Sequence, residues 1–249
     1  MEKTDILSLS LEELIIALDA LGEKKFRAEQ IFSWLHVKKV TEFEEMTNIS
    51  LELRTKLSEN FYIKRLNIAK RLESCTDNTI KYLYELDDGN HIETVLMEYK
   101  HGNSICISTQ VGCKMGCKFC ASTIAGFRRN LAPSEMLMQI YMAEKDSGRH
   151  VDSLVLMGIG EPLDNYRNVL DFLTILSSPE GRNLSLRHVS LSTCGLCDRI
   201  EDELGAPCEV VATGGLAGLI VPHCSRKITF SDTLLLDGLK IIWDAHGEK

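Results

Sequence analysis

The sequence of 249 residues contains no run of about 18 apolar residues, which is the length that a helix needs to cross a membrane. Residues 1–5 are polar and lack the apolar core of a secretory signal. We therefore expect no membrane partner and a reducing, cytoplasmic location, where disulfides rarely persist. The nine cysteines, an odd count, are then expected to be free thiols or metal ligands and not a disulfide framework.

Three of these cysteines, Cys113, Cys117 and Cys120, stand in one short segment with the spacing CxxxCxxC. Three thiolates this close can hold three irons of a [4Fe–4S] cluster, and the usual fourth cysteine ligand is missing nearby. An iron without a protein ligand is a reaction centre. The alternative is a structural zinc site with Cys106 as the fourth ligand, although zinc ligands usually come in short-spaced pairs and Cys106 lies on an expected strand.

Acidic residues are absent from residues 99–134, although the chain as a whole has a net charge of -8. The acidic total argues against a nucleic-acid partner. The stretch around the cysteines nevertheless carries Lys100, Lys114, Lys118, Arg128 and Arg129. Two compatible explanations stay open: these cations balance an anionic thiolate cluster, or they contact RNA phosphates.

The apolar pattern predicts an α/β fold in three parts. Residues 1–65 are predicted to form a small helical domain, in which Ser10 and Glu13 have the form of a capping box. Residues 66–103 alternate apolar and polar around a turn at residues 87–90, which predicts a β-hairpin extension. Residues 104–249 alternate strands with helices, which predicts an incomplete barrel of about four parallel βα units. The cysteine loop follows the first of these strands, at the end where βα barrels carry their chemistry.

Other candidate residues stand on strands or at strand ends. Gly160 and Glu161 belong to a GxGEP segment after the second core strand, which is a weak signal alone and a stronger one behind a cysteine loop. Ser192 ends the third core strand, where most hydroxyls only cap the strand. Cys106 is expected either to be a small buried residue or to face the barrel mouth. Glu93 lies in the hairpin, where a carboxylate is usually solvated.

Together, these segments resemble the radical SAM superfamily and, within it, the RNA adenine-C2 methyltransferases of RlmN type. The resemblance covers about residues 10 to 200 and depends on several long motifs in the same order. These motifs are residues 22–30, 92–95, 106–121, 126–131, 157–163 and 191–193. The resemblance implies a partial parallel (βα) radical SAM barrel with a small N-terminal helical domain and a β-hairpin extension.

The same resemblance implies two cofactors and a role for each candidate residue. The [4Fe–4S] cluster would be held by Cys113, Cys117 and Cys120. S-adenosylmethionine (SAM) would be contacted by Gly160, Glu161 and Ser192. Glu93 takes the place of a proposed general base, and Cys106 matches the cysteine that deprotonates and releases the methylated base.

The family reaction implies the partners. One SAM methylates a cysteine near the C-terminus, and a radical made from a second SAM transfers the methyl carbon to C2 of an adenine in 23S rRNA or tRNA. The resemblance therefore implies an RNA substrate, an N-terminal module that grips it, and an electron donor such as flavodoxin or ferredoxin, with no DNA and no membrane. The target base must be unstacked or lie in a loop to be reached.

The resemblance ends after about Gly195. A later SAM-contacting segment has no counterpart here, and none of the cysteines at 194, 197, 208 and 224 has the context of the methyl-carrying cysteine. Cys194 and Cys197 form a CxxC without a second pair, which favours two ordinary thiols. We expect a fragment, a degraded copy or a subunit that binds a cluster and SAM but does not methylate RNA alone. An RNA-binding remnant and a radical SAM enzyme with another substrate are the alternatives.

Overall fold

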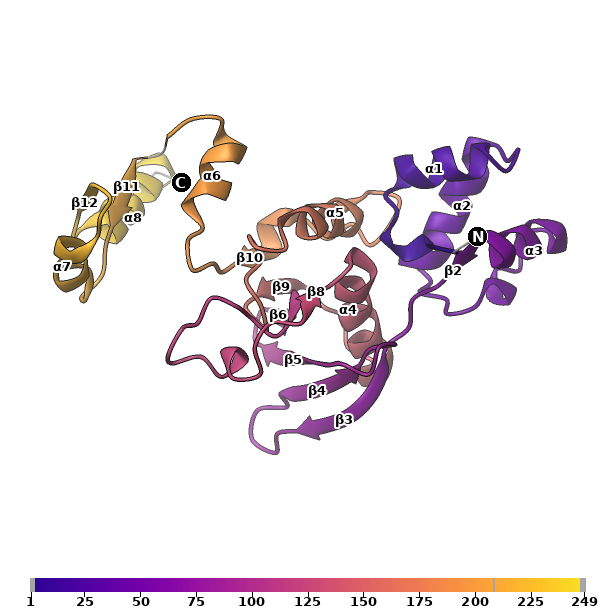
Figure 1. The fold of residues 1–249 in the computed structure, drawn as a ribbon, viewed down its shortest axis with the longest axis horizontal. Coiled ribbons are helices and arrows are strands. Elements are labelled where there is room, and N and C mark those ends of the chain that lie inside the picture. The colour runs from indigo at the N-terminus through magenta and orange to yellow at the C-terminus, as the bar shows by residue number, and fades with distance from the viewer. Residues whose placement is uncertain (1–2, 208, 247–249) are drawn as a thin grey trace. The chain divides into compact units, whose positions relative to one another are not determined.

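A computed structural model describes residues 3–207 and 209–246 and is drawn in Figure 1. The chain divides into two compact units, residues 1–195 and 196–249. Cys208, one of the cysteines compared above, lies outside the described residues. Within the described ranges, no helix combines the length and the apolar character that crossing a bilayer requires.

The first unit begins with a small helical module. Its elements are β1 (Thr4–Asp5), α1 (Leu11–Asp19), α2 (Lys25–His36), α3 (Leu51–Asn60) and β2 (Phe61–Tyr62), with short 3₁₀ helices at Ile6–Ser8 and Phe43–Glu45. The predicted capping box is confirmed, because the Glu13 N–H donates to the Ser10 hydroxyl over 3.2 Å and the Ser10 N–H donates to the Glu13 carboxylate over 2.9 Å. The helices bury Leu14, Phe32 and Leu57 in the core.

A six-stranded mixed sheet follows the module, with the strand order β10-β9-β6-β5-β4-β3. Each of the strands β3, β4 and β5 pairs antiparallel with the next strand in the chain. Strands β6, β9 and β10 pair in parallel. The strands are β3 (Asn67–Glu73), β4 (Ile80–Glu85), β5 (His91–Tyr99), β6 (Gly102–Cys106), β9 (Ser153–Leu156) and β10 (Val189–Leu191). The carboxyl ends of the three parallel strands therefore meet at one edge of the sheet.

Two helices connect the parallel strands. Helix α4 (Pro133–Ser147) lies between β6 and β9 in the chain, and α5 (Tyr166–Ser177) lies between β9 and β10. Pro133 begins α4 and Gly148, at a φ of 69°, ends it, which are the helix positions that proline and glycine favour. One face of the sheet packs on α4, since the buried ring of Tyr82 reaches it and donates its hydroxyl to Asp146 over 2.8 Å.

The α/β fold expected from the sequence is confirmed. The predicted hairpin, β4 with β5, hydrogen-bonds to β6 and so belongs to the same sheet as the parallel strands. This sheet contains three parallel strands, and the next expected one, β11 (Val210–Ala212), pairs in parallel with β12 (Ile228–Phe230) in the second unit. The second unit also contains α6 (Cys197–Leu204), α7 (Ala217–Ile220) and α8 (Leu234–His246). The domain limits 1–65, 66–103 and 104–249 stay a prediction.

A buried histidine joins the helical module to α4. His36 is fully buried at the end of α2, and its Nδ1 lies 3.0 Å from the hydroxyl of Tyr141. Its Nε2 has no hydrogen-bond partner among the described residues. Burial lowers the pKa of His36 from 6.5 to about 3, because a charged ring would lose its hydration there.

This histidine predicts a specific acid sensitivity. In the unfolded chain His36 takes up a proton below its ordinary pKa of 6.5, whereas in the folded chain it stays neutral until about pH 3. Stability is therefore lost as the pH falls through this window, by about 2 kcal/mol between pH 6.5 and 4.5. Urea unfolding at several pH values should show this loss in the natural chain and not in His36→Gln. Parallel pH profiles for the two proteins would contradict the assignment.

Candidate functional site

The cysteine loop leaves the sheet after β6 and is closed at its base by a short ladder. β7 (Gln110–Val111) pairs antiparallel with β8 (Arg129–Asn130), so the two ends of the loop lie side by side. Gly112 has a φ of 72°, and a Cβ there would lie 1.7 Å from the carbonyl oxygen of Gly126. Only glycine permits this crossing of the two chain segments. Cys113 is buried at the start of the loop, and Cys117 and Cys120 are half-buried.

The structure brings the predicted cluster and SAM residues into one pocket of about 280 Å³. The loop contributes Cys113, Cys117 and Cys120 to its lining. The ends of the next two parallel strands contribute further lining residues, among them Gly160, Glu161, Ser192, Thr193 and Cys194. Residues as far apart in sequence as Cys113 and Cys194 therefore share one site, as expected at the carboxyl edge of a parallel sheet. Their individual roles stay predictions.

The donor set of this pocket fits an iron–sulfur cluster. In the described part of the chain, no three His, Cys, Asp or Glu side chains converge closely enough to hold a single metal ion. A structural zinc site requires such convergence, whereas in a four-iron cluster each thiolate binds a different iron. Cys106, the fourth ligand of the zinc alternative, does not line the pocket. The zinc alternative therefore lacks its fourth ligand in this pocket.

The carboxylate of Glu161 connects the loop after β9 to the loop after β10 by hydrogen bonds. Glu161 is only 4% exposed. Its Oε1 accepts hydrogen bonds from the Thr193 hydroxyl at 2.7 Å and the Leu163 N–H at 2.9 Å, and its Oε2 accepts one from the Cys194 N–H at 2.7 Å. Burial by itself would raise the pKa of Glu161, but these hydrogen bonds to the charged form hold the pKa below its ordinary value. The group is therefore an ionised carboxylate at neutral pH.

Gln110 attaches the third loop to the same place, and the sequence analysis assigned it no role. Its side-chain oxygen accepts a hydrogen bond from the Glu161 N–H at 2.9 Å. Its amide nitrogen donates to Asn130 and to Asp164, both over 2.8 Å. The sequence feature that could have indicated this role is the position of Gln110, shortly after the first core strand and two residues before Gly112. A buried amide there links the base of the cysteine loop to the GxGEP segment.

Ser108 forms a second link under the pocket. Its hydroxyl accepts a hydrogen bond from the Ile159 N–H at 3.0 Å and donates to the Glu93 carbonyl over 2.7 Å. The Ser108 backbone is in turn held by the side chain of Gln139 from α4, through its N–H at 2.8 Å and its carbonyl at 2.9 Å. These hydrogen bonds connect the segment after β6 with β5, with α4 and with the GxGEP segment.

Glu93 and Cys106 lie on the sheet face that is opposite to α4, and neither lines the cysteine pocket. The register pairs Cys106 with Val95, so Glu93 is the diagonal neighbour of Cys106 across β5 and β6. Lys81 on β4 reaches Glu93 on β5 at 2.8 Å, and the two side chains are 46% and 44% exposed. Burial, partly offset by the Met157 backbone, raises the pKa of the Cys106 thiol.

The cations around the loop are partly neutralised by acidic residues from elsewhere. Lys114 pairs with Asp164 at 2.9 Å. Arg129 pairs with Glu135 at 2.8 Å and with Asp88 at 2.6 Å. Because part of the positive charge is balanced within the protein, the basic stretch of the sequence presents fewer cations to a partner than its composition suggests.

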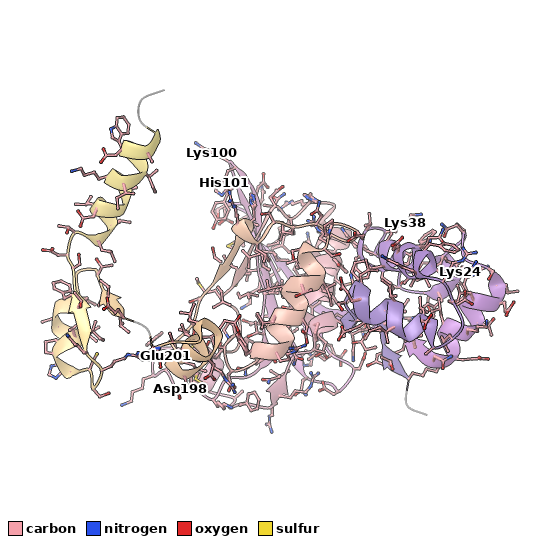
Figure 2. All side chains as sticks on the ribbon, turned by 90° about the horizontal axis from the view of Figure 1, so that it is seen from above. Lys24, Lys38, Lys100, His101, Asp198 and Glu201 are labelled. Carbon is pink, nitrogen blue, oxygen red and sulfur yellow. The ribbon has the colours of Figure 1, made fainter. Side chains whose placement is uncertain are left out.

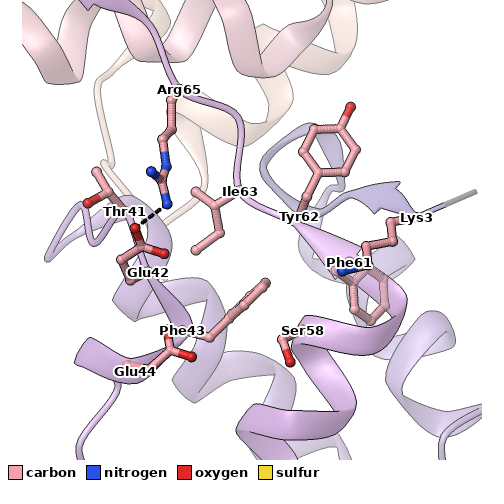
Figure 3. Close-up of a pocket in the computed structure, with 10 residues that line it drawn as sticks. All are labelled: Lys3, Thr41, Glu42, Phe43, Glu44, Ser58, Phe61, Tyr62, Ile63 and Arg65. Atoms are coloured by element: carbon pink, nitrogen blue, oxygen red, sulfur yellow. Dashed lines mark hydrogen bonds and ion pairs between the residues drawn. The ribbon is translucent and has the colours of Figure 1, made fainter. Parts of the chain in front are cut away.

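A second pocket, drawn in Figure 3, lies in the helical module. It is lined by Lys3, Thr41, Glu42, Phe43, Glu44, Ser58, Phe61, Tyr62, Ile63 and Arg65. Arg65 forms an ion pair with Glu42 across it. Since both ends of this pair are about half exposed, the pair is a surface contact and not a buried reactive centre.

Gly160 offers a direct test of the pocket's backbone. Its φ is 109°, and a Cβ there would lie 2.6 Å from the Cβ of Gln110. We expect Gly160→Ala to destabilise the loop by about 1–3 kcal/mol, because it adds both backbone strain and a collision. Urea unfolding and hydrogen exchange of residues 158–163 measure this effect. Gly215→Ala is the matched control, since nothing lies within 4 Å of the added methyl. Equal stability of the two variants would contradict the analysis.

Two family models match the chain. The model of the ribosomal RNA large subunit methyltransferase N-terminal domain matches residues 4–63, which is the helical module. The model of the radical SAM superfamily matches residues 107–212, which include the cysteine pocket.

Curated relatives match over most of this chain. A probable dual-specificity RNA methyltransferase RlmN from Lachnoclostridium phytofermentans is 53% identical over 199 residues, which cover 80% of this chain and 56% of that protein. The protein of the same name from Alkaliphilus metalliredigens is 51% identical over 206 residues, with coverages of 83% and 58%. The chain thus spans somewhat more than half the length of these relatives.

A solved structure agrees with these matches. The crystal structure of a radical SAM methyltransferase from Sphaerobacter thermophilus has a TM-score of 0.74 and 30% sequence identity, and the match covers 91% of this chain and 75% of that one. Family models, curated relatives and fold point the same way: the chain belongs to the radical SAM methyltransferases, and the curated relatives that it resembles are of RlmN type.

Proposed function

We propose that this chain provides the cluster- and SAM-binding part of a cytoplasmic methyltransferase that acts on C2 of adenine in 23S rRNA and tRNA. The observation that carries the proposal is the pocket in which three cysteines meet the GxGEP segment and the end of β10. An ordinary methyl donor suits a nucleophilic target, and C2 of adenine is electron-poor. A radical cofactor supplies the reactivity that protein side chains lack, while the protein positions it.

In this proposal the pocket residues have separate tasks. Cys113, Cys117 and Cys120 hold the [4Fe–4S] cluster, which when bound supplies the electron that cleaves SAM. The ionised Glu161 attracts the ammonium group of SAM by its negative charge, which the surrounding hydrogen bonds stabilise. Gly160 lets the backbone approach the ligand, and Ser192 offers a hydroxyl at the end of β10.

The opposite sheet face would receive the target base. Glu93 serves as the general base and Cys106 as the thiol that releases the product, because the two are diagonal neighbours on that face. Lys81 forms a direct ion pair with Glu93 on that face. The adenine must leave its stack to reach these groups.

The helical module, residues 1–65, would bind the RNA outside the pocket. Lys24 and Lys38 stand on its surface (Figure 2), and the Lys38 ammonium lies 3.5 Å from the centre of the Trp34 ring. Cations interleaved with aromatic rings suit contacts with phosphates and unstacked bases. An electron donor such as flavodoxin or ferredoxin would reduce the cluster. Neither DNA nor a membrane is a partner in this proposal.

The cluster assignment predicts the behaviour of single-cysteine variants. After anaerobic reconstitution, the chain should be brown, with about four irons and four sulfides per protein. Each of the variants Cys113→Ala, Cys117→Ala and Cys120→Ala should lose most of the iron. Cys75→Ala should keep it, because Cys75 is an exposed thiol that does not line the pocket. Iron and sulfide analysis with absorption spectra tests this. A colourless, folded natural chain would refute the proposed function.

The reaction assignment is tested on two products separately. With reductant and SAM, the reconstituted chain should form deoxyadenosine, and Glu161→Gln should reduce its yield about tenfold or more because it removes the charge that orients SAM. Mass spectrometry of added rRNA and tRNA tests the second step. Absence of deoxyadenosine would leave an RNA-binding remnant. Appearance of 2-methyladenine would contradict our expectation that this chain alone does not methylate RNA.

A further inference from the structure

A fourth thiol lines the cysteine pocket. Cys194 follows β10 and shares the pocket with Cys113, Cys117 and Cys120. Its backbone is fixed, because its N–H donates to the buried Glu161 carboxylate over 2.7 Å. The CxxC spacing with Cys197 led the sequence analysis to two ordinary thiols. The structure instead places Cys194 among the predicted cluster ligands.

Several neighbouring groups influence the pKa of the Cys194 thiol. The residue as a whole is exposed, and it stays accessible from the pocket. Partial loss of hydration, then the Glu161 carboxylate and then Cys117, raise the pKa of the Cys194 thiol to about 11. Without a metal, the thiol is therefore neutral and unreactive at pH 7. Its sulfur is thus close enough to both Glu161 and Cys117 for their charges to act on it.

We propose that Cys194 supplies a fourth thiolate to the cluster while SAM is absent, and that SAM displaces it. This inference depends on the proposed function. Four cysteines are the ordinary ligand set of a [4Fe–4S] cluster. On binding, the Cys194 sulfur forms one bond to iron and its proton passes to solvent, because a coordinating thiol is deprotonated even when its free pKa is high. On displacement, the thiolate takes a proton back, and no electron is transferred in either direction.

Competition follows from the position of Glu161. Its carboxylate accepts the Cys194 backbone N–H and lies beside the Cys194 thiol, and it is also the group proposed to hold SAM. In this proposal, SAM and the Cys194 sulfur compete for the end of the pocket beside Glu161. The neighbours Ser192 and Thr193 offer only hydroxyls, which are poor ligands for iron in such clusters. Cys194 is therefore the one thiol at this end of the pocket, within the described residues, that can close the open iron.

The test uses the whole reconstituted chain with Cys194→Ala and Cys194→Ser, and with Cys75→Ala as the control. Iron and sulfide contents should be equal in all four proteins, the natural chain and the three variants, because the three predicted ligands remain in each. Mild ferricyanide oxidation, followed by EPR, reports the loss of the open iron as a three-iron cluster. We expect this loss to be several-fold faster in both Cys194 variants than in the control. Titration with SAM, followed by the EPR of the reduced cluster, should give about tenfold tighter binding, or about 1.4 kcal/mol, when the competing thiol is absent.

The outcomes separate this inference from the proposed function. Equal oxidation rates and equal SAM affinities in natural chain and variants would overturn the role of Cys194 while leaving the three-cysteine cluster intact. Loss of the cluster in Cys194→Ala would also overturn it, since Cys194 would then be an obligatory ligand and not a displaceable one. Failure of all four proteins to take up a cluster would refute the inference and the proposed function together.

Discussion

The buried carboxylate of Glu161 is the contact on which the site depends. It accepts hydrogen bonds from the segment after β10 and from its own loop after β9, while its backbone N–H binds Gln110 after β6. The three loops that follow the three parallel strands are thereby held around one charged group. A buried charge is stable only when it is fully hydrogen-bonded, so the loops and the carboxylate stabilise one another. The pocket with its thiols is the result.

The alternation of side chains on the strands assigns different tasks to the two faces of the sheet. Tyr82, Tyr84 and Thr94 point to α4 and are fully buried, and they belong to the core. Lys81 and Glu93, one position along, point to the other face and are each about half exposed. Successive side chains of a strand point to opposite faces. Packing of one set of side chains on α4 therefore determines which side chains lie on the opposite face, where the substrate is proposed to bind. Core packing and the proposed chemistry are therefore coupled through register.

The parts of the site that could be predicted are those that lie close together in sequence. The spacing of Cys113, Cys117 and Cys120 limits what three thiolates can bind, and a glycine-rich segment after an apolar run marks a strand end. The role of Gln110 could not be predicted, since its partners lie 20 and 54 positions away and meet it only after the strands have paired. The same holds for Lys81 with Glu93, which needs the register of β4 and β5. The place of Cys194 in the pocket could not be predicted either, since it depends on β10 pairing beside β9 and not on the spacing to Cys197.

The most direct measurement is a crystal structure of the anaerobically reconstituted chain with SAM, with iron located by anomalous scattering. Our account predicts a four-iron cluster on Cys113, Cys117 and Cys120, with the methionine end of SAM against Gly160 and Glu161 and the carboxylate contacts to Thr193 and Cys194 retained. A single metal ion in the pocket, a cluster held elsewhere, or SAM bound away from Glu161 would contradict it.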